Sequence, residues 1–374
     1  MRIKAIAALL TGMLSVGSTQ ITTLVWELEV DTRGTEGTIE AAEFAKSDRF
    51  IVTGSADGKV NVWQQSDRQL VWQSIYWDGS IDGKTGEVEA VAFSPDGEWV
   101  AAGGNSDGIK IYRGSDGELV AELGGDGADG IAFSNNGQYF AAPDKNTLRL
   151  YNPADWERYD DFRVRHDCDV NSIDFSPDDQ YVLTGSCDRT VKITRIEDGD
   201  QVREIDAAEE GGSIKSVRVS PDGQWIATGN GPEGAVKIFR FADGELIATL
   251  NHDGTNVEAV AFSPDGRYLA TAGGDPEDNS PSEHTSFRIY RVDGFELQEQ
   301  IIAHAEGVEY LDFSPDSQYL LSAGEDGILK LWQLNEASTN VTSLTTVVVA
   351  GLGMLGIAGA IAFWYKGKRG KAKG

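Results

Sequence analysis

The 374-residue chain carries 60 acidic and 32 basic residues, so its formal net charge at pH 7 is −28. All acidic residues lie between Glu27 and Glu336, and seven basic residues lie outside that range, which leaves the stretch between with a charge of −35. Such a surface repels nucleic acid and anionic lipid headgroups, and this argues against both as partners. Three causes of the acidity compete: solubility in a salty habitat, a solvated face with no specific purpose, and a cation-binding role.

The chain begins with a pattern typical of a secretory signal peptide. Arg2 and Lys4 provide a basic start, residues 5–16 are an apolar core, and small residues follow at Gly17 and Ser18. We therefore expect residues 1–18 to form a signal peptide that is cleaved near Gly17 or Ser18. An uncleaved membrane anchor is the alternative.

Seven copies of one unit, an apolar strand followed by a turn, occupy the middle of the chain. The clearest copies are Val91–Gly97 and Val260–Gly266. The anchor residues that end the apolar strand lie 40 to 51 residues apart; they are Phe44, Phe93, Phe133, Phe175, Val219, Phe262 and Phe313. A repeat of about 40–50 residues with several short strands is typical of a β-propeller blade.

Each unit predicts a four-stranded antiparallel meander. In the second unit, we expect strands a to d at 89–93, 99–102, 109–112 and 118–123, with a Ser-Pro-Asp-Gly turn after strand a. Strand c closes on an aromatic residue in six units: Trp63, Tyr112, Tyr151, Phe239, Tyr290 and Trp332. The fourth unit has Thr194 at this position.

The last unit lacks a fourth strand of its own, because Asn335 leads straight into a polar segment. An unpaired apolar segment, Leu24–Val30, exists at the other end of the chain. We therefore predict an all-β, seven-bladed propeller of four-stranded antiparallel blades over residues 24–335, with the last blade closed by the N-terminal strand, so that the sheet edge is covered.

These units resemble the WD40-repeat family, in the variety with Ser-Pro-Asp-Gly turns that is common in prokaryotes. The pattern Gly54–Trp63 carries the resemblance, together with the aspartates of the b–c turns: Asp57, Asp107, Asp144, Asp188 and Asp326. The Trp-Asp dipeptide is missing in register, since Trp63 precedes Gln64 and Trp332 precedes Gln333. The histidine before strand a is present only as His166, His252 and His304. The family's His–Asp tetrad should therefore be complete in few blades. The resemblance implies scaffolding of protein partners without catalysis.

The two cysteines are predicted to pair. Cys168 precedes strand a of the fourth blade, and Cys187 lies in the b–c turn of the same blade. Connections d–a and b–c fall on the same face of a meander, so we predict a disulfide, which fits an oxidising compartment.

Two connections on that face are longer than their counterparts, Trp77–Glu87 and Gly274–Ser286. Lengthened loops on one face of a repeat scaffold are common binding sites, although they are also tolerated as solvated insertions. The candidate partner-binding residues in them are Trp77, Asp78, Asp82, Lys84, Asp275, Glu277, Asp278, Glu283 and His284.

Several segments match the sequence strings of enzyme or cofactor motifs but lack the structural context that those motifs need. Gly104–Gly108 fits the nucleophile-elbow string and Gly229–Gly234 fits the dinucleotide string, yet a strand follows each one where those motifs need a helix. Gly124–Ala132 matches the calcium-binding nonapeptide once. Asp126 and Asp129 are its candidate calcium ligands, but such sites use stacked copies, so an acidic turn is the alternative. We predict no catalytic residues and no cofactor.

The C-terminal end has the composition of a membrane anchor. We expect a short polar linker at 336–346, a transmembrane helix at 347–365 and a basic tail at 366–374 that stays in the cytoplasm. The propeller would then lie outside the cytoplasm. The leading hypothesis is a membrane-anchored, monomeric scaffold that binds a protein partner. The alternatives are a propeller enzyme, a ligand or calcium binder that uses acidic residues of the channel, and an envelope structural protein.

Overall fold

A computed structural model describes residues 21–30, 38–47, 49–76, 86–104, 108–125, 129–160, 162–231, 234–252, 256–273 and 285–335. The chain divides into two compact units, Met1–Leu334 and Asn335–Gly374. Every strand among the described residues belongs to the first unit. Among the described residues, none forms a helix with the length and apolar character needed to cross a membrane. The predicted signal peptide, linker, transmembrane helix and basic tail lie outside the described residues.

The strands form seven four-stranded antiparallel sheets. The first four blades are β2 (Ile39–Phe44), β3 (Phe50–Ser55), β4 (Lys59–Gln64) and β5 (Leu70–Ile75); β6 (Ala90–Phe93), β7 (Trp99–Gly103), β8 (Ile109–Arg113) and β9 (Leu119–Leu123); β10 (Ala132–Phe133), β11 (Phe140–Asp144), β12 (Thr147–Tyr151) and β13 (Val164–Arg165); and β14 (Val170–Phe175), β15 (Tyr181–Ser186), β16 (Thr190–Arg195) and β17 (Gln201–Asp206). The last three are β18 (Ser213–Val219), β19 (Trp225–Gly231), β20 (Ala235–Arg240) and β21 (Leu246–Asn251); β22 (Ala259–Phe262), β23 (Tyr268–Ala272), β24 (Ser286–Arg291) and β25 (Glu296–Ile302); and β26 (Val308–Phe313), β27 (Tyr319–Gly324), β28 (Ile328–Leu334) and β1 (Thr22–Glu29).

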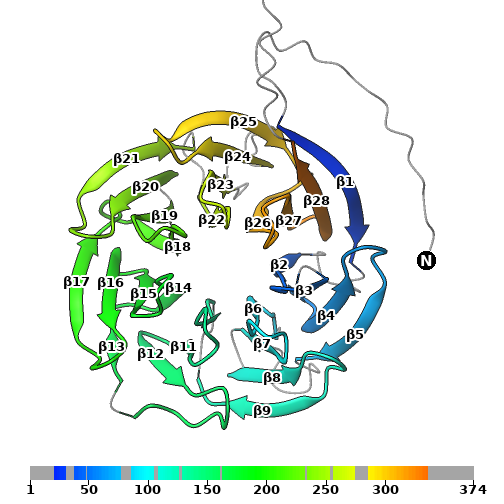
Figure 1. The fold of residues 1–374 in the computed structure, drawn as a ribbon, viewed down its shortest axis with the longest axis horizontal. Helices are drawn as coiled ribbons and strands as arrows, with labels where there is room; N and C mark the ends of the chain where they lie inside the picture. Colours follow the sequence, from blue (N-terminus) through cyan, green and yellow to red (C-terminus); the bar gives the residue numbers. More distant parts are fainter. Residues whose placement is uncertain are drawn as a thin grey trace, which may run out of the picture. The chain divides into compact units, whose positions relative to one another are not determined.

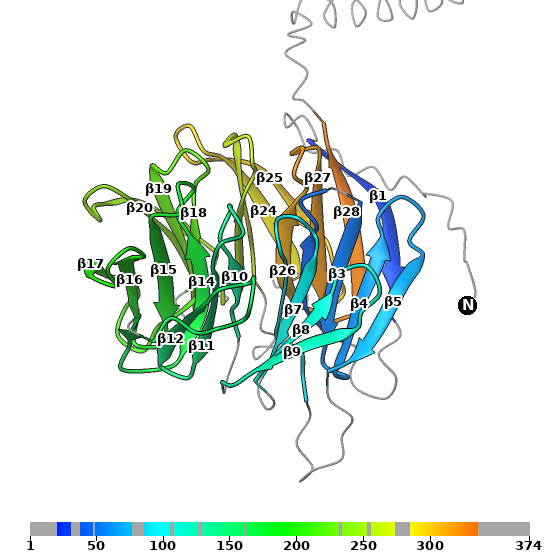
Figure 2. The same ribbon diagram turned by 60° about the horizontal axis from the view of Figure 1, so that its bottom comes forward.

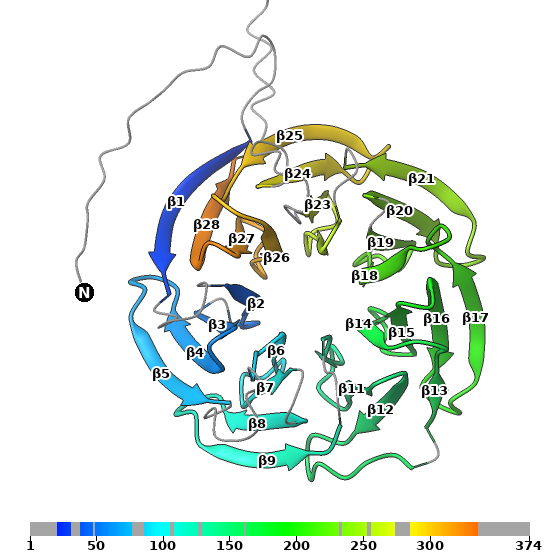
Figure 3. The same cartoon turned by 180° about the vertical axis from the view of Figure 1, so that it is seen from behind.

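The blades stand in a ring around a central channel (Figure 1). The first strand of each blade lines the channel and the fourth lies at the rim, and the view from behind shows the same order (Figure 3). Seen from the side, the strands run between two faces (Figure 2). One face carries the a–b and c–d turns, and the other carries the b–c and d–a connections.

The predicted closure of the ring is confirmed. Strand β1 pairs antiparallel with β28 from Thr22 opposite Leu334 to Glu29 opposite Ile328, with one bulge between Leu24 and Trp26. The seventh blade is therefore built from both ends of the propeller sequence (Figure 1). In the second blade, each predicted strand agrees with the observed one to within one residue at either end.

The core lies between consecutive blades. One cluster joins Val52 and Tyr76 of the first blade to Val91, Phe93 and Tyr112 of the second. Another joins Ile39 and Phe44 to Leu321 and Leu331 of the seventh blade, so the closing blade shares a buried apolar core with the first. Since each sheet is apolar on both faces, a blade is stable only between two neighbours.

The histidine tetrad is incomplete in most blades, as the sequence predicts. In the seventh blade, Trp332 Nε1 donates to Ser322 Oγ at 2.9 Å, and His304 lies 2.8 Å from that hydroxyl and 2.9 Å from Asp326. In the fourth blade, His166 contacts Thr184 and Asp188, but Thr194 replaces the aromatic residue. The Thr194 hydroxyl is buried without a hydrogen-bond partner, which leaves this blade with an incomplete network.

Candidate functional site

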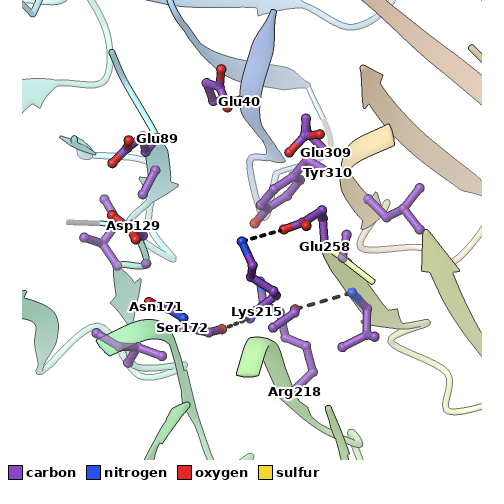
Figure 4. Close-up of a pocket in the computed structure, with 18 of the residues that line it drawn as sticks. Glu40, Glu89, Asp129, Asn171, Ser172, Lys215, Arg218, Glu258, Glu309 and Tyr310 are labelled. Atoms are coloured by element: carbon purple, nitrogen blue, oxygen red, sulfur yellow. Dashed lines mark hydrogen bonds and ion pairs between the residues drawn. The ribbon is translucent and has the colours of Figure 1, made fainter. Parts of the chain in front are cut away.

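A ring of polar side chains surrounds one mouth of the channel (Figure 4). Each comes from the same position, four residues before a blade's anchor residue. In blade order the seven residues are Glu40, Glu89, Asp129, Asn171, Lys215, Glu258 and Glu309, all of which line one cavity of about 560 Å³. Because strand a begins near this position, the mouth opens on the face of the d–a and b–c connections.

Local strand geometry directs several of these side chains toward the channel. The pairing of strands a and b slips by one residue around Glu40, Asn171, Lys215 and Glu309. Such a β-bulge leaves one residue out of the ladder and re-aims its side chain. The mouth is therefore a product of a repeated backbone irregularity.

Three carboxyl groups of the mouth, those of Glu40, Glu89 and Glu309, hold their protons more tightly than free carboxyls. Burial, followed by the charges of Glu87, Glu325 and Glu258, raises the pKa of Glu40 to about 7. Burial and the neighbouring Asp129 raise the pKa of Glu89 to about 8. The pKa of Glu309 is also raised well above its ordinary value, first by burial and then by nearby glutamates. The crowded acids repel one another, so a cation placed among them would be stabilised.

Charge is distributed unevenly around the mouth. Asn171 stands on the fourth blade and Lys215 on the fifth, whereas carboxyl groups occupy this position in the other five blades (Figure 4). The ammonium group of Lys215 lies 3.5 Å from Glu258 and neutralises only that side. Tyr310 places an aromatic ring within the same cavity. The arrangement can receive a cationic side chain beside an aromatic surface.

Deeper in the channel, carboxyl groups serve the fold instead. The backbone N–H groups of Phe44, Phe93 and Val219 donate to acids of the preceding blade at 2.8, 3.2 and 2.7 Å. The accepting residues are Asp312, Glu43 and Asp174, which lie directly before their anchors. Each bond links two blades, so these acids stabilise the ring.

The predicted disulfide is present at the face of the channel mouth. Cys168 and Cys187 are joined, with their Cα atoms 5.3 Å apart. Cys187 lines the same cavity as the ring of polar residues. The bridge therefore ties a d–a connection to a b–c turn at the edge of the mouth.

Most of the predicted binding residues cannot be placed. The candidate residues of the two long connections, Trp77 to Lys84 and Asp275 to His284, lie outside the described residues, as does Asp126. Asp129 is described and belongs to the mouth, next to Glu89. Within the described part of the chain, no three histidine, cysteine or acidic residues are grouped so that they could hold a metal ion.

The enzyme-like strings fall within blades. Gly104 lies between β7 and β8, and Gly229–Gly231 ends β19 just ahead of β20. Of the seven residues in the ring, only Asp129 is among the predicted site residues. The signal of the ring is nevertheless readable, since comparing the residue four before each anchor shows a polar residue in every unit.

The comparison with protein families agrees with this architecture. The WD domain, G-beta repeat (WD40) family matches residues 26–64, 78–113, 162–194, 199–240, 244–279 and 295–333, which is more than half of the chain. The chain belongs to the WD40 repeat family. The matches leave out residues 114–161, which hold most of the third blade.

Three curated proteins show weaker similarity. Nuclear distribution protein nudF of Aspergillus niger is 27% identical over 192 residues, 48% of this chain and 42% of that protein. Actin-interacting protein 1 of Drosophila melanogaster is 24% identical over 49% of this chain and 28% of that protein. Serine-threonine kinase receptor-associated protein of Gallus gallus is 24% identical over 56% of this chain and 55% of that protein. The chain thus spans between about a quarter and just over half of their lengths.

Proposed function

We propose that this protein is a membrane-anchored, extracytoplasmic scaffold that binds a protein partner without catalysis, and that the partner docks at the acidic mouth of the channel. The observation that carries the proposal is the ring of seven polar residues around the 560 Å³ cavity. Its raised carboxyl pKa values favour a cationic occupant, because a positive charge there relieves repulsion among Glu40, Glu89 and Glu309.

Family membership supports binding over chemistry. Two of the similar proteins are named for interacting or associating with other proteins. A lysine or arginine side chain of a partner segment matches the mouth in charge, and the ring of Tyr310 can pack against its apolar stem or its cation. A neutral or acidic segment would leave the acids uncompensated.

The export part of the proposal rests on composition and on the disulfide. The signal-like residues 1–18 and the apolar residues 347–365 support an anchored protein with the propeller outside. The Cys168–Cys187 bridge is consistent with an oxidising compartment.

Site-specific photocrosslinking tests the docking surface. A photoreactive phenylalanine analogue replaces Asn171 at the mouth of the full chain, and Gln138 on the other face in a matched control. In envelopes of the source organism, we expect a protein crosslink from the mouth position that weakens at high salt and in the Glu40→Gln/Glu309→Gln variant. A crosslink of equal yield from position 138, or none from position 171, would contradict the proposal.

Protease shaving of intact cells tests the topology. A membrane-impermeant protease should remove an epitope in the propeller and spare an epitope appended to the basic tail. If the propeller epitope survives until the cells are lysed, the extracytoplasmic placement is wrong, whereas the docking surface could still be correct.

A further inference from the structure

The third blade differs from its neighbours in its outer strand. In the first blade, five residue steps from Leu70 to Ile75 lie opposite four steps from Trp63 to Lys59. In the third blade, Arg158 lies opposite Tyr151 and Arg165 opposite Thr147, so seven steps lie opposite four. The two extra residues do not fit the ladder, and regular pairing is reduced to the two residues of β13 (Figure 1).

The break in this strand opens a groove against the fourth blade. Tyr159 stands at the break with 40% of its surface exposed, and its ring lies 5.7 Å from that of Tyr139. Leu150, Phe162 and Ile196 form a buried apolar floor. The cavity holds about 620 Å³, which falls within the range of roughly 300–1,000 Å³ typical of binding pockets.

The rim of the groove is polar and mainly acidic. Asp179, Glu197 and Asp198 belong to the turns of the fourth blade that border it. The guanidinium of Arg195, the cation among the lining residues, donates to Asp198 at 2.6 Å and is therefore already neutralised. These are a–b and c–d turns, so the groove opens toward the face opposite the acidic mouth.

The groove belongs to the part of the chain that departs from the family. The WD40 matches omit residues 114–161, and Tyr139, Leu150 and Tyr159 all lie in that stretch. The two extra residues distinguish the third blade from the first, whereas the channel is common to all propellers.

We propose that this groove is a second docking site, which binds an extended segment of a partner protein through one large apolar side chain flanked by lysine or arginine. The apolar side chain would fill the floor beside Tyr159, and the basic residue would face Glu197 and Asp179. A second copy of this chain is a poor occupant, because its surface carries the same strong negative charge. The site stands independently of the channel mouth, from which it is separated by the height of the blade.

Selection from a phage-displayed library of random dodecapeptides on the purified full chain tests this site. We expect enriched peptides to share a Phe, Trp, Leu or Ile next to Lys or Arg. A fluorescein-labelled enriched peptide should lose about tenfold or more in affinity with Tyr159→Ala or with Glu197→Lys. The matched controls, Leu119→Ala on the neighbouring rim and Glu98→Lys on the same face, should leave the affinity unchanged.

Any of three results would overturn the proposal. These are a library without enrichment, enriched peptides that lack the apolar–basic pair, or peptides that bind the Tyr159→Ala and Glu197→Lys chains as tightly as the unaltered chain. Because both residues are exposed, unchanged thermal unfolding of the variants is expected and separates a lost site from a lost fold. Peptides that are instead released by Glu40→Gln would assign the binding to the channel mouth.

Discussion

At the residue scale, two unusual turn residues, Asn135 of the third blade and Asp179 of the fourth, are joined by hydrogen bonds between the blades. Asp179 stands where four other turns have glycine, and it adopts a left-handed φ of 53°. Its carboxylate accepts bonds from the backbone N–H groups of Asn135 and Asn136 at 2.7 and 2.8 Å. Asn135 in turn stands where five other turns have proline and so supplies an N–H that proline lacks. The inter-blade bonds offset the backbone strain.

This pair predicts non-additive effects on stability. Asp179→Gly relieves strain but loses the two backbone N–H bonds and a third from the Asn135 side-chain amide at 3.0 Å, so we expect a net loss of about 1 kcal/mol in the free energy of unfolding. Asn135→Pro should cost a similar amount, and the double variant about the same as either single one. Denaturant unfolding of the four chains measures the coupling, with Leu119→Ala combined with Asp179→Gly as an additive control. Additivity of the Asn135 and Asp179 changes would show that the bonds contribute nothing.

The disulfide gives a second prediction at this scale. The bridge closes a loop with a sequence separation of 19 residues, so removing it should cost roughly 3 kcal/mol at most by loop entropy. The bonds from His166 and the Asp167 N–H to Asp188 join the same two segments, and we therefore expect the blade to stay folded. Adding reductant should lower the unfolding midpoint of the native chain and leave that of Cys168→Ser/Cys187→Ser unchanged. A native midpoint insensitive to reductant would contradict this view.

At the element scale, the closing strand β1 depends on a contact with the sixth blade. Glu299 of β25 accepts bonds from the Ile21 N–H and the Thr22 hydroxyl, each at 3.0 Å. Truncation by Glu299→Ala leaves both donors unsatisfied, so we expect faster amide hydrogen exchange at the start of β1 and a stability loss of about 1 kcal/mol. Glu296→Ala on the same strand is the control. Equal protection of Thr22–Leu24 in both variants would show that pairing with β28 alone holds the strand.

Regular strands were predictable from the sequence because each is bounded by a strong turn signal. Pro95 and Gly97 delimit the second blade's first turn, and its observed strands differ from the prediction by one residue at most. The broken outer strand of the third blade was not predictable in the same way. Its two extra residues change a pairing register, and register depends on contacts with β12 that a linear pattern does not encode.

The candidate site was predictable only in part. The disulfide was predictable because the order of strands in a meander already places the d–a and b–c connections on the same face, and this inference needs no side-chain geometry. The mouth was missed because its residues differ in type and sign from blade to blade, so no repeated letter marks them. Lys215 and Glu258 in particular occupy equivalent positions with opposite charge. Both residues line one cavity, and a β-bulge lies at Lys215.

At the scale of the whole molecule, the propeller gathers negative charge around its own axis. The mouth contains Glu40, Glu89, Asp129, Glu258 and Glu309, with Glu87 and Glu325 as further acidic neighbours and Lys215 as a cation. A closed ring cannot move these groups apart without separating blades. The repulsion is therefore built into the fold, and proton or cation binding is the means of relieving it.

This charge predicts a stability that rises as the pH falls from 8.5 to 6.5. Folding raises the pKa of Glu40 to about 7 and that of Glu89 to about 8, so the folded chain binds more protons than the unfolded chain in this window. Stability is then lost as the pH rises through these values, by on the order of 2 kcal/mol between the two ends. Burial lowers the pKa of His166, and the opposing effect of this residue is confined to lower pH. Thermal unfolding at both pH values tests the argument, and the Glu40→Gln variant, which lacks one of the titrating carboxyls, should show a smaller difference than the unaltered chain. A partner that brings a cation should remove part of the same pH dependence by binding more tightly at pH 8.5, whereas equal affinity at both values would show that the partner does not touch the mouth.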